Sequence, residues 1–201
     1  MRVLLIANVQ INPQQLPGRW VEGWALDLHT LYSIPIDPLS NLWDTKRPPI
    51  AEKLYLLKYR NEISHAREIA AVASSFLKRK NWKIDVIIPI PPSNTNRTFQ
   101  PVYEIAKHIG QYLNIFVDTN VLRKVKSTSE LKDIIEPEKR REILKDAFSI
   151  DTNALLGKNV LIFDDLYRSG ETLSAAFDAI SSRAKANKIY VLTITKTRSK
   201  R

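Results

Sequence analysis

The stretch that decides the fold is VLIFDDLYRSGETL, at Val160–Leu173. It begins with an apolar run, and two aspartates follow this run directly. The pattern predicts a buried strand with Asp164 and Asp165 at its carboxyl end. A short loop, Leu166–Glu171, comes next, and Thr172 opens a helix. A strand, a loop and a helix in this order are typical of an α/β sheet.

The rest of the chain alternates amphipathic helices with short apolar strands. Apolar residues at helical spacing predict helices over Ser64–Arg79, with Ser64 as the N-cap, and over Gln100–Leu113. Strands are expected at Val3–Val9, Ile84–Ile90, Ile115–Val121, Val160–Phe163 and Ile189–Thr195. This alternation predicts a doubly wound α/β fold with a parallel sheet, whose ligands bind at the carboxyl ends of the strands.

The first part of the chain differs from the remainder in composition. Residues 1–49 are rich in Pro and Trp and show little helical periodicity, whereas the alternating pattern begins at Ile50. Pro48 and Pro49 suit a helix start at this boundary. We therefore expect a small N-terminal subdomain at 1–49 and an α/β domain at 50–201.

Composition restricts the chemistry and the partners. The chain has no cysteine, which excludes disulfides, thiolate metal sites and a cysteine nucleophile. No apolar run approaches the ~20 residues of a membrane span, so we expect a cytoplasmic protein without a membrane partner. The net charge of +10 fits either a lysine-rich surface or an anionic partner, namely a polyphosphate or nucleic acid.

The loop after the two aspartates has the chemistry of a phosphate site. Backbone N–H groups at a helix N-terminus favour an anion, and Gly170 lets the backbone approach it closely. Ser169, Thr172 and Arg168 add side-chain donors. The two carboxylates would repel a phosphate but accept hydrogen bonds from sugar hydroxyls, so the stretch predicts a site for a phosphorylated pentose.

Two other interpretations of the aspartates remain open. They could hold magnesium as in a receiver domain, with Lys196 as the later lysine, although receivers place their acidic pair after the first strand. They could also be solvated loop residues. A Walker-type loop is excluded because its glycine–lysine motif is absent.

The stretch resembles the signature of type I phosphoribosyltransferases that binds 5-phosphoribosyl-1-pyrophosphate (PRPP). In that signature a hydrophobic strand and Asp-Asp precede a loop of hydroxyl residues and glycine. Asp164 and Asp165 match its ribose-binding acids, and Arg168 departs from it, because a small hydroxyl residue is common there. The resemblance implies a PRPP ribose-phosphate site made of Asp164, Asp165, Leu166, Tyr167, Arg168, Ser169, Gly170, Glu171 and Thr172.

A narrower resemblance, to the ComF family of competence-associated phosphoribosyltransferase-like proteins, covers the pattern of Leu54–Thr195. The segments LYLLKYRNE, DVIIPIPPSNTNRTFQ, LRKVKSTSEL and EKRREILKDAF carry it. The matching positions are Leu57, Lys58, Tyr59, Arg97, Phe99, Arg123, Thr128, Arg140 and Phe148. Thr98 and Gln100 depart from the family's pattern, and its Cys-rich zinc element is missing.

These resemblances imply a type I phosphoribosyltransferase-like sheet with an N-terminal hood over the acceptor. They imply a Mg²⁺-dependent transferase that moves the 5-phosphoribosyl group of PRPP to a nitrogenous acceptor and releases pyrophosphate. Asp164, Asp165 and Arg123 are the expected catalytic residues. The implied pyrophosphate loop is Pro91, Pro92, Ser93, Asn94 and Arg97, and the implied flexible loop is Lys126, Ser127 and Thr128.

The acceptor side is less defined. Trp20 and Trp24 are candidates for stacking on an acceptor ring, and core packing explains them equally well. The magnesium ion is expected to bind through PRPP, without a direct protein ligand. A PRPP-binding protein without turnover, acting on single-stranded DNA during uptake, is the alternative function. A regulatory PRPP sensor and a homodimer also stay open.

Overall fold

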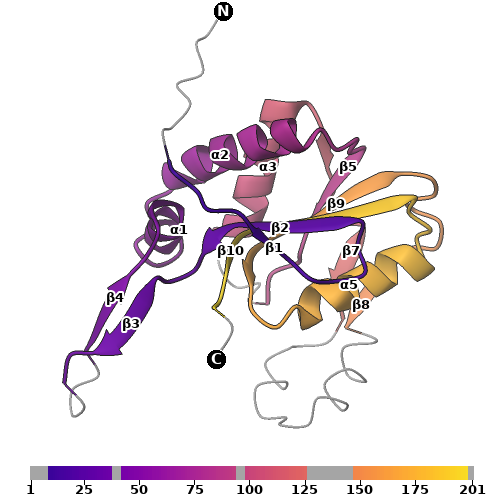
Figure 1. Cartoon of the computed structure of the whole chain (residues 1–201). Helices are drawn as coiled ribbons and strands as arrows, with labels where there is room; N and C mark the ends of the chain where they lie inside the picture. Colours follow the sequence, from indigo (N-terminus) through magenta and orange to yellow (C-terminus); the bar gives the residue numbers. More distant parts are fainter. Residues whose placement is uncertain (1–8, 38–41, 94–97, 126–146, 199–201) are drawn as a thin grey trace, which may run out of the picture.

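The structure is a computed structural model that describes residues 9–37, 42–93, 98–125 and 147–198. Figure 1 shows the arrangement of its helices and strands. In chain order these are β1 (Gln14–Gln15), β2 (Glu22–Leu28), β3 (Tyr32–Pro35), β4 (Trp43–Lys46), α1 (Pro49–Tyr59), α2 (His65–Lys80), β5 (Val86–Pro89), α3 (Pro101–Leu113), β6 (Phe116–Val117), β7 (Leu122–Lys124), β8 (Phe148–Ile150), β9 (Asn159–Tyr167), α5 (Glu171–Ser182) and β10 (Lys188–Lys196).

The central feature is a six-stranded sheet with the strand order β1-β2-β10-β9-β5-β6. β1 is antiparallel to β2, and the other neighbours pair in parallel. Helices α2 and α3 lie on one side of this sheet and α5 on the other (Figure 1). The prediction of an α/β fold with a parallel sheet flanked by helices is confirmed.

Strand alternation divides the core into two layers. In β9, Val160 and Ile162 pack against α5, whereas Leu161 and Phe163 face the layer of α1, α2 and α3. All four side chains are fully buried. A strand buried on both faces reads as a continuous apolar run, which is why the deciding stretch is recognisable in the sequence.

The predicted helices are confirmed with small shifts at their ends. The second helix starts at His65 with Ser64 at the N-cap position, but Ser64 has helical dihedrals and its side chain makes no capping hydrogen bond. The third helix runs from Pro101 with Gln100 at the N-cap. The expected cap at Ser64 was therefore wrong in its hydrogen bond, although right in its position.

The predicted strands differ in length from the observed ones: Ile84–Ile90 is shortened to β5, Ile189–Thr195 is lengthened to β10, and two others change more. β9 continues through Asp164 and Asp165 to Tyr167, because its pairing with β10 goes on to Lys196. The loop is therefore shorter than expected. The strand predicted at Ile115–Val121 is reduced to β6, since the Asp118 carboxylate accepts the N–H groups of Asn120 and Val121 and turns the chain. Of Val3–Val9, residues 3–8 lie outside the described residues.

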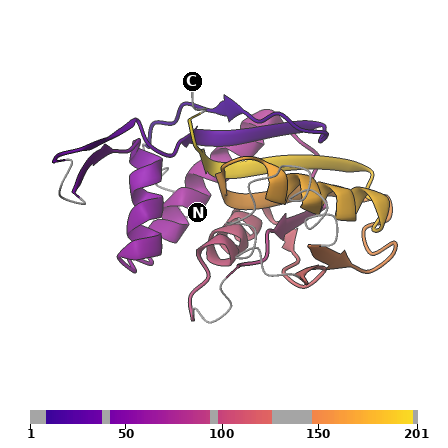
Figure 2. The same ribbon diagram turned by 90° about the horizontal axis from the view of Figure 1, so that it is seen from below.

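The N-terminal segment contributes to two parts of the molecule. β1 and β2 belong to the central sheet, and β2 pairs with β10. β3 and β4 form a separate two-stranded hairpin that projects from the body, as Figures 1 and 2 both show. The division at residue 49 stays a prediction. Across the described ranges, no helix is long and apolar enough to cross a membrane.

Candidate functional site

A cavity of about 330 Å³ lies where β5 and β9 end. Parallel strands bring their carboxyl ends to one edge of the sheet, where such folds bind ligands. Three of the predicted ribose-phosphate residues, Asp164, Asp165 and Thr172, line it. The other lining residues are Lys58, Ile90, Pro91, Pro92, Ser93, Gln100, Pro101, Val102, Tyr103 and Lys124.

The pKa of the Asp164 carboxyl lies far from its usual range. Its Oδ1 accepts the backbone N–H of Asp165 at 2.8 Å, a bond that stabilises the charged carboxylate. Burial works against the charge, and the neighbouring Asp165 adds a second negative charge. Together they raise the pKa of Asp164 to about 8. In the ligand-free protein the Asp164 carboxyl is therefore mostly protonated at neutral pH.

Asp165 is ion-paired with a lysine from α1. Lys58 Nζ lies 2.5 Å from Asp165 Oδ2, and the two side chains are only 22% and 13% exposed. Burial alone would lower the pKa of Lys58, but the charge and hydrogen bond of Asp165 outweigh it, so this pKa is raised. Lys58 is therefore a fixed positive charge inside the cavity.

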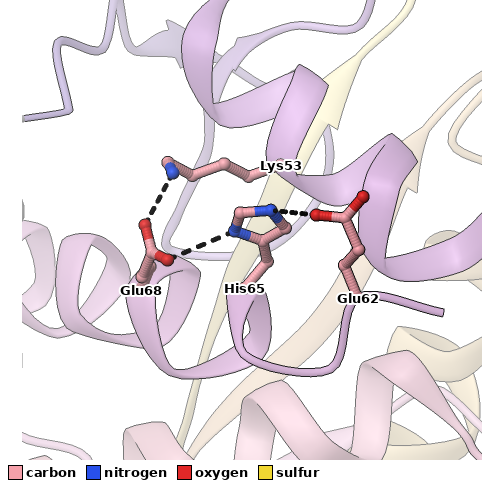
Figure 3. Close-up of polar contacts among 4 residues, drawn as sticks. All are labelled: Lys53, Glu62, His65 and Glu68. Atoms are coloured by element: carbon pink, nitrogen blue, oxygen red, sulfur yellow. Dashed lines mark hydrogen bonds and ion pairs between the residues drawn. The ribbon is translucent and has the colours of Figure 1, made fainter. Parts of the chain in front are cut away.

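A polar cluster between α1 and α2 holds the helix that carries Lys58 (Figure 3). Lys53 Nζ of α1 lies 2.6 Å from Glu68 Oε2 of α2. The imidazole of His65 lies between two carboxylates, with Nδ1 3.2 Å from Glu68 and Nε2 3.1 Å from Glu62. These contacts fix α1 on α2 one helical turn or more from Lys58.

The loop between β9 and α5 has a backbone that only glycine adopts easily. Gly170, the N-cap of α5, has φ +81°, and a Cβ there would lie 2.5 Å from the Tyr167 hydroxyl oxygen. Thr197 holds the other side of the loop, because its N–H donates to the Tyr167 carbonyl at 2.9 Å. Its hydroxyl donates to the Arg168 carbonyl. The loop is thus fixed with the first turn of α5 at the cavity.

Six of the nine predicted ribose-phosphate residues divide between two cavities, and Leu166, Gly170 and Glu171 line neither. Asp164, Asp165 and Thr172 line the one described above. Tyr167, Arg168 and Ser169 line a second cavity of about 550 Å³, together with Pro17, Lys196, Thr197 and Arg198. Arg168 is exposed and Gly170 is buried. The loop therefore lies between a cavity with carboxylates and a basic one.

The predicted pyrophosphate loop is described in part. Pro91, Pro92 and Ser93 line the first cavity, whereas Asn94 and Arg97 lie outside the described residues. Lys124 Nζ donates to Ser93 Oγ at 2.8 Å. Burial lowers the pKa of Lys124, and the nearby Asp164 opposes this effect. Lys124 thus brings a second cation to the cavity.

Arg123 does not line the cavity. Its side chain is exposed, and its Nε donates to the Asn120 carbonyl at 3.2 Å. Neighbouring residues of a strand point to opposite sides, so Lys124 reaches the cavity in place of Arg123. The predicted flexible-loop residues Lys126, Ser127 and Thr128 lie outside the described residues.

The two tryptophans proposed for the acceptor take part in packing. Trp20 is 7% exposed, donates its indole N–H to the Leu16 carbonyl and contacts Phe177 edge-on. Trp24 packs against Phe76 in the other core layer and donates to Glu22. Neither lines the cavity. Trp20 is thus part of the core, Trp24 is partly buried against it, and their role toward an acceptor stays a prediction.

The sequence interpretation missed the chemical importance of Lys58. Its ammonium group pairs with the Asp165 carboxylate in the cavity. Lys58 stands in the matched segment LYLLKY, where apolar neighbours on a helix face signal a partly buried lysine. Nothing local in the sequence pairs it with Asp165, which is far away along the chain.

The described residues contain no cluster of three or more His, Asp or Glu side chains that could hold a metal ion by themselves. Asp165 is already paired with Lys58. Binding of Mg²⁺ through PRPP stays a prediction.

Comparisons with known proteins gave structural matches alone. No family model and no curated protein matches the sequence. The fold is similar to adenine phosphoribosyltransferase from Saccharomyces cerevisiae, at 17% identity over 82% of this chain and 83% of that chain, with a TM-score of 0.49. A Trypanosoma brucei adenine phosphoribosyl transferase matches at 10% identity over 87% of this chain and 71% of that one, with a TM-score of 0.44.

A third match is UMP synthase from Leishmania donovani, at 16% identity and a TM-score of 0.40. It covers 80% of this chain, which spans 27% of the length of that synthase. At these values the comparisons describe similarity of architecture, and the functional argument rests on the cavity residues.

Proposed function

We propose that this protein binds PRPP with Mg²⁺ and transfers its 5-phosphoribosyl group to a nitrogenous acceptor with release of pyrophosphate. The observation that supports this most is one cavity with a pair of adjacent carboxyls, two lysines and the first turn of a helix. Carboxylates suit the ribose diol, and lysines and helix N–H groups suit the phosphates of the same molecule.

In this proposal each part of PRPP has its own residues. Asp164 and Asp165 accept hydrogen bonds from the ribose hydroxyls. The loop Leu166–Thr172 binds the 5′-phosphate through its backbone N–H groups and Thr172. Ser93 and Lys124 bind the pyrophosphate at the ends of β5 and β7. When the diol binds Asp165, Lys58 can turn from this carboxylate to the phosphates.

The reaction needs few acidic or basic groups from the protein. The bond between C1 of the ribose and pyrophosphate breaks, and C1 then bonds to a nitrogen of the acceptor through a transition state with positive charge on the sugar. The Asp165 carboxylate stabilises this charge, and the lysines stabilise the leaving group. Mg²⁺, when bound with PRPP, supplies further charge neutralisation on the pyrophosphate.

The similarity to the ComF family supports an alternative within the same site. A PRPP-binding protein without turnover, acting on single-stranded DNA in the cytoplasm during competence, would also use the acidic pair. The net charge of +10 favours it. In either case we propose that residues 1–49 act with the domain at 50–201, and that the acceptor or nucleic acid binds beside the PRPP cavity.

Titration calorimetry tests the proposal. PRPP should bind in the presence of Mg²⁺ and not in its absence, and Asp164→Ala with Asp165→Ala should abolish the heat. The matched control is Asp151→Ala, an exposed aspartate outside the cavity. Unchanged heats for the double variant would refute the assignment.

A second measurement separates turnover from binding alone. Pyrophosphate release from Mg²⁺-PRPP with a panel of nucleobases reports transfer. Binding of single-stranded DNA that weakens steeply with salt, without pyrophosphate release, would favour the alternative.

A further inference from the structure

The β3–β4 hairpin is unusually apolar and exposed. Both strands are exposed along most of their length, and no other strand in the described residues pairs with either of them. Six large hydrophobic side chains of residues 31–43 are 38–66% exposed. They are Leu31, Tyr32, Ile34, Ile36, Leu42 and Trp43. We call this segment, residues 31–45, the arm.

The arm carries the opposite charge to the rest of the chain. LYSIPIDPLSNLWDT contains Asp37 and Asp44 and no lysine or arginine, so its net charge is −2 in a chain of +10. The remainder of the chain therefore carries +12. An acidic and apolar surface does not suit nucleic acid or an anionic membrane, whereas it suits a basic protein surface with apolar residues.

A two-stranded hairpin without a packed face is at best marginally stable in water. Figures 1 and 2 show β3 and β4 extending away from the sheet and from α1, so the body of their own chain does not cover these two strands. Singly exposed apolar residues are ordinary, but a cluster of this kind marks an interaction site.

We propose that the arm of one copy packs on the body of a second copy, and that the exchange is reciprocal. The body offers a surface of matching character at the turn between α1 and α2. There Tyr59 and Ile63 are 61% and 50% exposed, beside the exposed Arg60 and Arg67 and one exposed carboxylate, that of Glu62. A contact of this kind brings the net charge of −2 of the arm to a basic surface. Two arms packed on each other would instead bring four carboxylates together.

The exposed apolar area of the arm is large enough for a stable interface only if the exchange is reciprocal. Six side chains about half exposed present on the order of 500 Å² of apolar area, given ~150–250 Å² for a whole large side chain. One arm alone gives a small interface. Two arms, each with the surface that it covers, approach the ~1,600 Å² of a standard protein interface. Two-fold symmetry makes both contacts equal.

Sedimentation velocity of the full chain across a wide concentration range tests the proposal. We expect a dimer that Ile34→Ser with Trp43→Ser weakens by about a hundredfold or more, as truncation of two central anchors does. Both positions are exposed, so circular dichroism should show that the variant is folded. Phe116→Ser with Leu156→Ser, at positions 66% and 65% exposed outside the arm, should leave the dimer intact.

The charges distinguish the two ways of packing. Asp37→Asn with Asp44→Asn should weaken the dimer, and high salt should do the same, if each arm meets a basic body. A tighter dimer in this variant would overturn the proposal in favour of contact between arms. A chain that stays monomeric, a dimer indifferent to the arm substitutions, or a monomer that binds neutral vesicles through the arm would each overturn it as well.

Discussion

Asp164→Asn is expected to make the ligand-free protein more stable than the wild type, by a margin that grows as the pH rises. The same substitution should remove PRPP binding. Burial and the charge of Asp165 raise the pKa of Asp164 from 3.8 to about 8. Because the folded state binds this proton more tightly than the unfolded chain, the wild type loses stability between about pH 4 and pH 8. An asparagine resembles the protonated acid and carries no charge to be lost.

The size of the effect follows from the same values. Each pH unit within the window costs the wild type up to about 1.4 kcal/mol relative to the variant. Asp164 is only half-buried by its accessible surface, and Lys58 and Lys124 lie near its carboxyl, so the full window should amount to about 2–4 kcal/mol. Near pH 4 the two proteins should be about equally stable, and the difference should level off above pH 8.

Urea unfolding at a series of pH values, followed by the fluorescence of the four tryptophans, measures this difference. Asp151→Asn, at an exposed position outside the cavity, is the control and should run parallel to the wild type. Parallel curves for Asp164→Asn and the wild type at every pH would refute the reasoning, since they would mean that Asp164 is ionised in the folded protein throughout.

Three further outcomes are expected. Lys58→Met should lower the free energy of unfolding by about 1–3 kcal/mol, because it leaves the Asp165 carboxylate without its ion pair, and Lys58→Arg should recover most of this loss in the same urea assay. Gly170→Ala should lower the free energy of unfolding by about 2–4 kcal/mol, because of the positive φ and the clash with Tyr167. Gly157→Ala, at φ +71° with nothing within 4 Å, should lower it by only about 1 kcal/mol. Equal losses for the two variants would contradict the clash. Thr172→Ala should weaken PRPP binding by about 1–3 kcal/mol in calorimetry and Thr172→Ser should not, and equal affinities for all three would remove Thr172 from the site.

The sequence predicted the parts of the fold that depend on local pattern. The apolar run Val160–Phe163 and the helix behind it were recognisable, because a buried strand and an amphipathic helix leave distinct periodicities. Asp164, Asp165 and Thr172 were placed at one site for the same reason. The aspartates lie in the last part of one strand and Thr172 in the helix after it, and the carboxyl end of a parallel strand determines where they lie.

Contacts between distant segments could not be predicted in this way. Lys58 meets Asp165 only because α1 packs on the sheet beside β10 and β2, and no local pattern encodes that packing. Arg123 and Lys124 are equivalent by composition, and only the orientation of β7 decides which of them reaches the cavity. Trp20 and Trp24 are equivalent by composition, and only the structure shows that they pack into opposite layers of the core.

The pairing of β2 with β10 has a consequence for how the molecule is made. Glu22–Leu28 finds its parallel neighbour in Lys188–Lys196, so about 160 residues must be synthesised between the two. At ~5–20 residues per second this takes roughly 10–30 s, during which one edge of β2 lacks its final partner on the ribosome. Contacts of such long sequence separation also slow refolding. Until β10 emerges, the nascent chain carries an open strand edge that chaperones or misfolding can engage, and the joining of these two strands is the step that ends this exposure.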